Sequence, residues 1–201
     1  MSLSPPDLRP GEAAALAART AARAADEGVA EIAYTRVDSP LGALVAFATA
    51  RGVARIGYEL EDGGLDDILD DVALRLSPAI VEAPRRLDPL RRELDEYFDG
   101  RRRVFEIDVD WALTGGGFRR RVLQECARIP FGATSTYREI AGAAGSPKAF
   151  RAAGNALGSN PLPIVVPCHR VLASGGGLGG YTGGLERKRT LLTIEGGMLA
   201  V

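Results

Sequence analysis

Residues 136–157 read TYREIAGAAGSPKAFRAAGNAL, and this stretch predicts two short helices joined by a tight turn. Thr136 and Glu139 have capping-box spacing, in which the threonine accepts from a first-turn amide and the glutamate reaches back to the cap. Gly145 ends that helix, and Ser146-Pro147 supplies an N-cap and a first-position proline for a second helix. Two short helices joined through glycine indicate a helix-turn-helix.

The second helix, expected over residues 147–157, has a thin surface. Its long cations are Lys148 and Arg151, and its small positions are Ala149, Ala152, Ala153 and Gly154. Such a helix can approach a DNA groove closely, and it suits contact with shape and backbone rather than base edges. Taken alone, the small residues are better explained by packing against a neighbouring helix, because helical hairpins are common in proteins that never touch DNA.

Residues 160–170, NPLPIVVPCHR, are the most specific feature, since they combine an apolar run, three prolines and the only histidine of the chain. Each proline disfavours helix at the preceding residue, so Cys168 should be held on a stiff approach. His169 could take the thiol proton, with the Glu195 carboxylate orienting the ring. In a regular strand Cys168 and His169 would point to opposite faces, so their cooperation requires a turn or a bridging water. The alternative is an inert packing cysteine.

Residues 175–184, GGGLGGYTGG, form a loop before a final helix over 185–194. Glycine lets the backbone approach a ligand, and Tyr181 supplies a flat face, so the loop could be one wall of a base pocket. A flexible connector is the simpler alternative. Upstream, residues 118–129 have helical apolar spacing, and Cys126 within them is expected to be a small buried hydrophobe without a chemical role.

The first half predicts a mixed α and β layer. Short β-rich segments separated by turn signals indicate an antiparallel meander, followed by two helices and a further strand. The expected ranges are a helix over 10–27, strands over 31–37, 41–50 and 52–58, helices near 68–76 and 89–98, and a strand over 104–109. The glycine run at 114–117 marks a domain boundary. The predicted fold class is α+β, with an extension over 1–28 and domains over 29–113 and 114–201.

Composition sets the functional class only loosely. The formal net charge of −1 divides into 11 Lys/Arg against 19 Asp/Glu in residues 1–100, and 14 against 7 in residues 101–201. A basic second half fits a nucleic-acid partner, although charge asymmetry also serves solubility. With neither a secretory leader nor a membrane-spanning run, the protein is expected in the cytoplasm. Two cysteines and one histidine favour neither a disulfide framework nor a zinc site, so no metal is expected.

These motifs together resemble the O6-alkylguanine-DNA alkyltransferases, also called methylated-DNA–protein-cysteine methyltransferases. The resemblance covers about residues 118–196, through Asn160-Pro161, Pro167–Arg170, Tyr181–Gly184, Leu191-Leu192 and Glu195-Gly196. Residues 31–110 are loosely similar to the family's ribonuclease-H-like N-terminal domain. The resemblance therefore implies a ribonuclease-H-like domain followed by a mainly helical domain with the helix-turn-helix.

The chemistry that the resemblance implies is direct-reversal DNA repair without a cofactor. Cys168 would accept the alkyl group of O6-alkylguanine, with O4-alkylthymine as a further candidate, and His169 with Glu195 would activate it through water. Asn160 would brace the turn that carries the cysteine, and Tyr137 would donate towards the guanine ring. Because no residue could hydrolyse a carbon–sulfur bond, each molecule should react once.

The resemblance also implies a monomer that binds double-stranded DNA in the minor groove with the alkylated base flipped out, and no membrane partner. Arg151 would take the place of the flipped nucleotide. Residues implied to contact DNA beside it are Thr136, Lys148, Ala149, Ala152 and Gly154. Residues implied to line the pocket are Pro163, Val171, Tyr181, Thr182, Gly183 and Lys188, of which the Thr182 amide and Lys188 would help the departing guanine oxygen. Phe150 departs from the small or aliphatic residue expected beside the finger.

Two other functions are compatible with parts of the sequence. A lesion-binding protein would recognise the alkylated base without transfer, but relatives of that kind have another residue in place of the cysteine. A cysteine hydrolase could use Cys168, His169 and Glu195, but the basic helix pair and the glycine loop would then be unexplained.

Overall fold

A four-stranded sheet forms the centre of the first half in the computed structural model, which describes residue 20 and residues 30–196. The elements here are β1 (Ile32–Val37), β2 (Leu44–Thr49), β3 (Gly52–Tyr58), α2 (Leu65–Arg75), β4 (Ile80–Glu82), the 3₁₀ turn η1 (Pro84–Leu87) and α3 (Asp88–Phe98). The first three strands form the expected antiparallel meander. The sequence missed β4, which pairs parallel to β1 and gives the order β3-β2-β1-β4. The expected helix over 10–27 and the extension over 1–28 lie outside the described residues.

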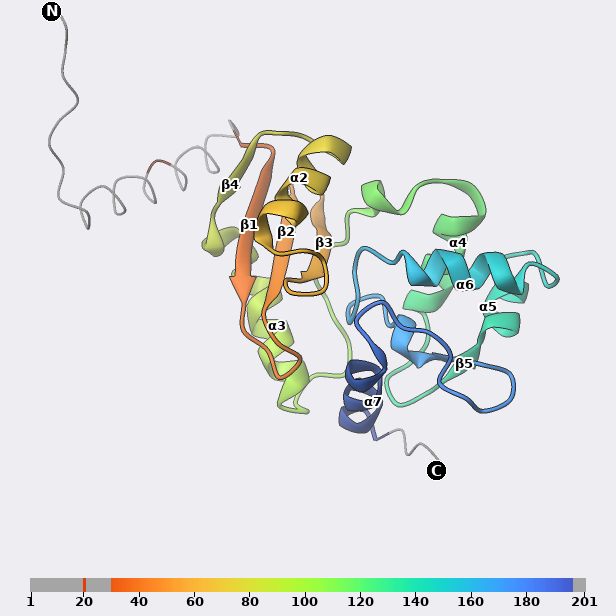
Figure 1. Cartoon of the computed structure of the whole chain (residues 1–201). Helices are drawn as coiled ribbons and strands as arrows, with labels where there is room; N and C mark the ends of the chain where they lie inside the picture. The colour runs from red at the N-terminus through yellow and green to blue at the C-terminus, as the bar shows by residue number, and fades with distance from the viewer. Residues whose placement is uncertain (1–19, 21–29, 197–201) are drawn as a thin grey trace, which may run out of the picture.

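The two faces of the sheet follow from the alternation of side chains along each strand. On β2, Val45 and Phe47 pack with Ile68 and Val72 of α2. Leu44 and its same-face neighbours join the larger cluster that contains the buried side of α3. The sheet therefore lies between α2 on one face and α3 on the other (Figure 1).

The expected strand over 104–109 is wrong. Only Val109 makes a bridge, to Val53 at the edge of β3. Further along the same strand, the Ile56 amide donates to the carbonyl of Pro161 at 2.8 Å. The free edge of β3 is thus shared between two segments, and the lead-in to Cys168 occupies the place that a longer strand would need.

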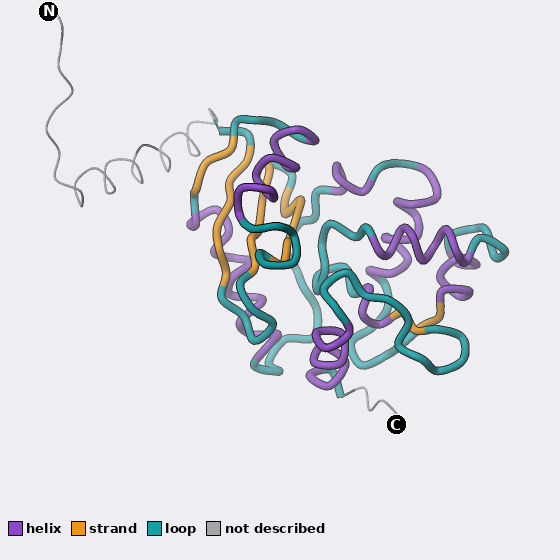
Figure 2. Tube along the Cα trace, in the orientation of Figure 1, coloured by secondary structure: helices purple, strands orange, loops and turns teal. Residues whose placement is uncertain are grey.

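The second half is mainly helical (Figures 1 and 2). Its elements are the 3₁₀ turn η2 (Trp111–Thr114), α4 (Gly117–Ala127), β5 (Ser135–Thr136), α5 (Tyr137–Ala143), α6 (Phe150–Gly158), the 3₁₀ turn η3 (Cys168–Arg170), β6 (Val171–Leu172) and α7 (Leu185–Ile194). The expected helices over 118–129 and 185–194 are confirmed to within two residues.

The helix pair forms as expected at its first helix and differs at its second. Thr136 and Glu139 make both bonds of the capping box. Gly145, at φ 83°, ends α5 in a Schellman motif in which the Ser146 amide donates to Ala141 O at 2.8 Å. Ser146 does not cap a helix at residue 147, because its carbonyl accepts from the Ala149 amide and closes a turn first. The second helix therefore begins at Phe150.

One core runs through both halves. Leu90 and Leu94 of α3 belong to the same buried cluster as Val122 and Leu123 of α4 and as Cys168. The α+β fold class and the ribonuclease-H-like arrangement followed by a helix-turn-helix part are confirmed. The boundary at residue 114 stays a prediction. Within the described part of the chain, no helix has the length and apolar character needed to cross a membrane.

Candidate active site

Cys168 lies on a series of tight turns rather than on a strand. Its amide donates to Val166 O at 2.8 Å, closing a three-residue turn around Pro167, and the Val165 amide donates to Pro163 O at 2.9 Å. The second turn places Ile164 at φ 74°, the one positive φ outside glycine among the described residues. Cys168 itself opens the η3 turn, so the turn that its cooperation with His169 requires is present.

Asn160 connects this series of turns to the sulfur. Its Nδ2 donates to Val166 O at 2.8 Å and to the Cys168 Sγ at 3.2 Å, while its Oδ1 accepts from the Leu162 amide at 3.0 Å. The side chain is buried. Asn160 therefore fixes the position of the sulfur and supplies it with a hydrogen-bond donor.

His169, which follows Cys168 in the chain, forms a buried pair with a carboxylate. The Nε2 of His169 is 2.8 Å from the Oε1 of Glu195, and the imidazole is completely buried. Burial alone would raise the pKa of Glu195, but hydrogen bonds from His169, Arg170 and Tyr97 outweigh it and lower that pKa to about 2. Because an ionised carboxylate only accepts, His169 carries its proton on Nε2. Its Nδ1, buried and without a partner among the described residues, then has a free lone pair.

Further hydrogen-bond donors fix the position of Glu195. Arg170 donates to both carboxylate oxygens, with its Nε 2.8 Å from Oε2 and its Nη2 2.8 Å from Oε1. The Gly132 amide donates to Oε2 at 3.3 Å, and the Tyr97 hydroxyl donates to Oε1 at 2.7 Å. The sequence interpretation assigned no role to Arg170 or Tyr97. Arg170 could have been found from its place beside the cysteine, whereas Tyr97 carried only the signal of an apolar helix position.

The reactive pair is uncharged at neutral pH. Burial raises the pKa of the Cys168 thiol above its ordinary 9.0, although the donor from Asn160 and the charge of Lys188 work in the opposite direction. Burial also lowers the pKa of His169 below 6.5, against the pull of Glu195. A neutral thiol gives up its proton to a base when its sulfur acts as a nucleophile, and the free Nδ1 of the neutral His169 imidazole could accept such a proton.

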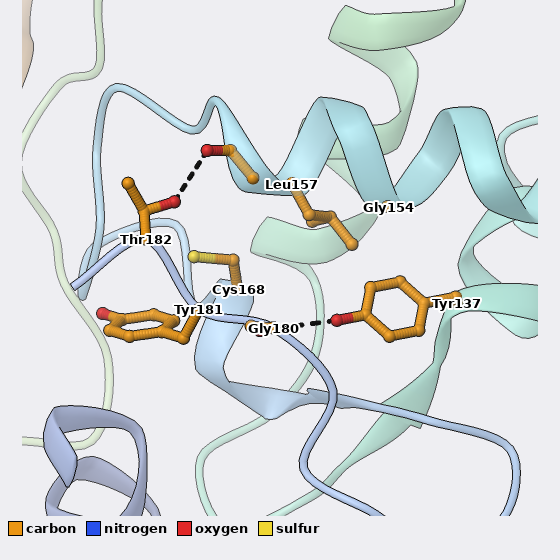
Figure 3. A pocket seen from close by; sticks show the side chains of 8 residues that line it. Tyr137, Gly154, Leu157, Cys168, Gly180, Tyr181 and Thr182 are labelled. Carbon is orange, nitrogen blue, oxygen red and sulfur yellow. Dashed lines mark hydrogen bonds between the residues drawn. The ribbon is translucent and has the colours of Figure 1, made fainter. Parts of the chain in front are cut away.

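A cavity of about 300 Å³ opens over the sulfur (Figure 3). It lies between α6 and the glycine loop, and its lining is Tyr137, Gly154, Leu157, Gly158, Cys168, Gly180, Tyr181 and Thr182. Two hydrogen bonds tie the loop across to the helix pair: Tyr137 donates to Gly180 O at 3.4 Å, and the Thr182 hydroxyl donates to Gly158 O at 2.7 Å. The glycine loop is therefore a wall of this cavity and not a free connector.

Strand β3 of the sheet contacts the glycine loop through Tyr58. The hydroxyls of Tyr58 on β3 and Tyr181 are 2.8 Å apart. A Cβ at Gly183 would lie 2.5 Å from the Tyr58 ring and 2.9 Å from the Tyr181 ring, so only glycine fits there. Arg187 lies over the Tyr58 ring, 4.7 Å from its centroid, and pairs with Glu61 at 2.6 Å.

Lys188 connects the glycine loop to β6 through backbone carbonyls. Its ammonium is completely buried and donates to Val171 O at 2.6 Å, to Leu178 O and to Gly180 O at 3.3 Å. Burial lowers its pKa to about 8. Pro163 and Val171 are buried next to the reactive turn, outside the residues that line the cavity.

The residues expected to contact DNA lie along and before α6. Arg151 and Ala152 are exposed in its first turn, Gly154 lines the cavity, and Lys148 and Ala149 belong to the turn that precedes the helix. Thr136 is occupied as the N-cap of α5. Two guanidiniums lie over the ring of Phe150, with that of Arg138 5.2 Å and that of Arg151 5.7 Å from the ring centroid. Figure 3 shows Gly154 and Leu157 on the helix above Cys168, so α6 joins this exposed surface to the cavity.

Comparisons with known proteins agree on one family. Residues 117–197 match the 6-O-methylguanine DNA methyltransferase, DNA binding domain. The methylated-DNA–protein-cysteine methyltransferase of Mycolicibacterium paratuberculosis is 41% identical over 164 residues, 82% of this chain and 92% of that protein. The constitutive enzyme of that name from Bacillus subtilis is 37% identical over 81% of this chain and 94% of its own.

Solved structures give the same picture. The O6-methylguanine methyltransferase of Mycobacterium tuberculosis superposes with a TM-score of 0.70 at 34% identity, covering 82% of this chain and 92% of that one. The Mycobacterium tuberculosis OGT in complex with DNA superposes with a TM-score of 0.69 at 36% identity, covering 81% and 92%. The similarity therefore includes the sheet as well as the helix pair.

Proposed function

The chain belongs to the methylated-DNA–protein-cysteine methyltransferase family, and we propose from that premise that it repairs DNA by moving the alkyl group of O6-alkylguanine to Cys168. The observation that carries the proposal is the position of the sulfur. It lies at a cavity, takes a hydrogen bond from Asn160, and is followed in the chain by a buried imidazole whose Nδ1 is free to accept a proton.

The transfer needs one base and one acceptor. The thiol proton passes to His169 Nδ1 through a bridging water, and the charge of Glu195 stabilises the imidazolium that forms. The sulfur attacks the alkyl carbon, so a C–S bond forms while the C–O6 bond breaks. The guanine then takes up a proton, and the imidazole returns to its neutral form.

The product is a thioether on Cys168, which water activated at an imidazole does not cleave. Each molecule therefore reacts once and is consumed. The protein is a stoichiometric reagent, and O4-alkylthymine is a second base that the same attack could serve.

The substrate reaches the sulfur only if its base leaves the DNA stack. We infer that α6 binds the minor groove of the duplex through its small exposed residues, that Arg151 fills the place of the flipped base, and that one protein molecule acts alone. The helix supports this arrangement because its first turn is exposed and its later residues line the cavity.

The test is peptide mass spectrometry after incubation with duplex DNA that contains one O6-methylguanine. The Cys168 peptide should gain one methyl group while the Cys126 peptide stays unmodified, and the Cys168→Ser variant should gain none. Binding without any mass change would favour a lesion-binding protein. Hydrolysis with an unmodified Cys168 would favour a cysteine hydrolase. Either result would refute the proposal.

A further inference from the structure

The catalytic carboxylate also accepts a hydrogen bond from a tyrosine of α3, in the first half of the chain. Tyr97, near the end of α3, is completely buried, and its hydroxyl donates to the Oε1 of Glu195 at 2.7 Å. We propose that Tyr97 is a positioning residue for alkyl transfer, which sets the hydrogen bond between Glu195 and His169 and so keeps the imidazole in its neutral, proton-accepting form. Its role in transfer rests on the proposed function, but its effect on His169 can be measured separately.

The geometry makes Tyr97 a competitor of His169 for one oxygen. Oε1 receives the Tyr97 hydroxyl at 2.7 Å, the His169 Nε2 at 2.8 Å and the Arg170 Nη2 at 2.8 Å. A carboxylate oxygen that accepts several donors gives less of its charge to each. The Tyr97 hydroxyl therefore reduces the stabilisation that Glu195 gives to a protonated imidazole. A carboxylate shared by His169 and Arg170 alone would stabilise it more.

Tyr97 can act only as a donor here. Burial and the charge of Glu195 raise the pKa of its phenol, so the hydroxyl is protonated at neutral pH. Its ring packs against three others, with centroid distances of 5.4 Å to Phe98, 5.4 Å to Phe105 and 6.1 Å to Phe131. The direction of the hydroxyl is thus fixed by packing before any substrate binds, as a preorganised site requires.

Other features around the imidazole also affect its protonation. Burial and the positive charges of Arg170 and Lys188 disfavour the protonated form, while Glu195 favours it. The Tyr181 ring meets the imidazole edge-on at 6.5 Å. Among these groups Tyr97 has a hydrogen bond to Glu195, so its hydroxyl should affect the protonation of His169 through that carboxylate.

The chain offers a direct measurement because it contains one histidine. In protein labelled with ¹⁵N-histidine, NMR reports the tautomer and the pKa of His169 without ambiguity. The wild-type imidazole should be in the Nε2–H form. Tyr97→Phe keeps the ring and removes the hydroxyl, and it should raise the pKa of His169 by about half a unit, roughly three-fold in the protonation equilibrium. The methyl-transfer rate should fall at acid pH as His169 becomes protonated, and the midpoint of this acid limb should rise by the same half pH unit.

Tyr34→Phe is the matched control, since that ring stacks on Phe47 at 5.8 Å in the separate cluster under α2, and it should move neither quantity. 3-Fluorotyrosine at position 97 is the second variant, because it retains the ring and hydroxyl but donates more strongly. It should lower the pKa of His169.

An imidazole that is unchanged in both Tyr97 variants would overturn the proposal, and so would a His169 pKa that shifts while the acid limb of the rate does not. Failure of the wild-type protein to transfer methyl groups would instead refute the proposed function. The NMR arm would then still decide whether Tyr97 controls His169.

Discussion

Replacing Glu195 by glutamine tests the buried network that the site depends on. The carboxylate has a pKa of about 2 in place of 4.5, and at about 1.36 kcal/mol per pKa unit this contributes roughly 3 kcal/mol to folding at neutral pH. Glutamine also leaves the buried guanidinium of Arg170 without its counter-charge, and breaking a buried pair costs about 3–5 kcal/mol. We therefore expect Glu195→Gln to lose about 3–5 kcal/mol of unfolding free energy at pH 7.

The pH dependence gives a second, independent reading. A carboxyl whose pKa is lower in the folded state stabilises the protein above its unfolded value of 4.5, and this contribution disappears as the pH falls towards 2. Urea unfolding between pH 2 and 7 should therefore show a steeper loss of stability in the wild type than in Glu195→Gln.

Glu186→Gln is the matched control, because Glu186 lies in the first turn of α7 and Glu195 caps the other end of that helix. Glu186 pairs with Arg189 at the surface, with 88% of its side chain exposed, so its removal should leave the urea midpoint nearly unchanged. Equal losses in the two variants, or the same acid slope in wild type and Glu195→Gln, would refute the buried-network account.

Three further changes test the cavity and the DNA surface. Gly183→Ala pushes a methyl group into the Tyr58 and Tyr181 rings, so it should lower the unfolding free energy measured in urea by about 1–3 kcal/mol and slow methyl transfer. Gly177→Ala adds its methyl group in open space and should change neither quantity, and equal effects of the two variants would contradict the close fit at Gly183. Arg151→Ala should slow repair of duplex DNA more than reaction with free O6-methylguanine, and equal losses would exclude the finger role. Phe150→Ala removes the ring under the Arg151 guanidinium, a contact worth about 0.5–1 kcal/mol, and should weaken duplex binding about two- to five-fold in a fluorescence anisotropy titration; unchanged or tighter binding would show that Phe150 does not organise Arg151.

Local signals in the sequence predicted local structure well. The capping box at Thr136 and Glu139 and the glycine stop at Gly145 depend on residues a few positions apart, and the structure has both. The meander was predictable because its turns and β-rich segments are contiguous. The expected helix start at residue 147 was wrong because the Ser146 carbonyl accepts a hydrogen bond within a turn. Ser146-Pro147 is compatible with a helix start and with such a turn, and the sequence does not decide between them.

Long-range contacts were the part that the sequence could not provide. Residues 104–109 have strand-like character, yet the edge that they would join is partly taken by Pro161, more than fifty residues away. Tyr97 lies in the expected helix over 89–98, and only the fold brings its hydroxyl to Glu195. The motif around Cys168 contains Asn160 and His169, whereas Tyr97 and Glu195 reach the same network from distant segments.

We propose a single irreversible transfer to Cys168, and a titration of methylated duplex against protein measures its stoichiometry. A fixed amount of the wild-type chain should restore an equal number of guanines, with each restored base matched by one methylated Cys168, and then stop while substrate remains. Restoration of several guanines per protein molecule, or of any guanine without a methyl group on Cys168, would contradict it.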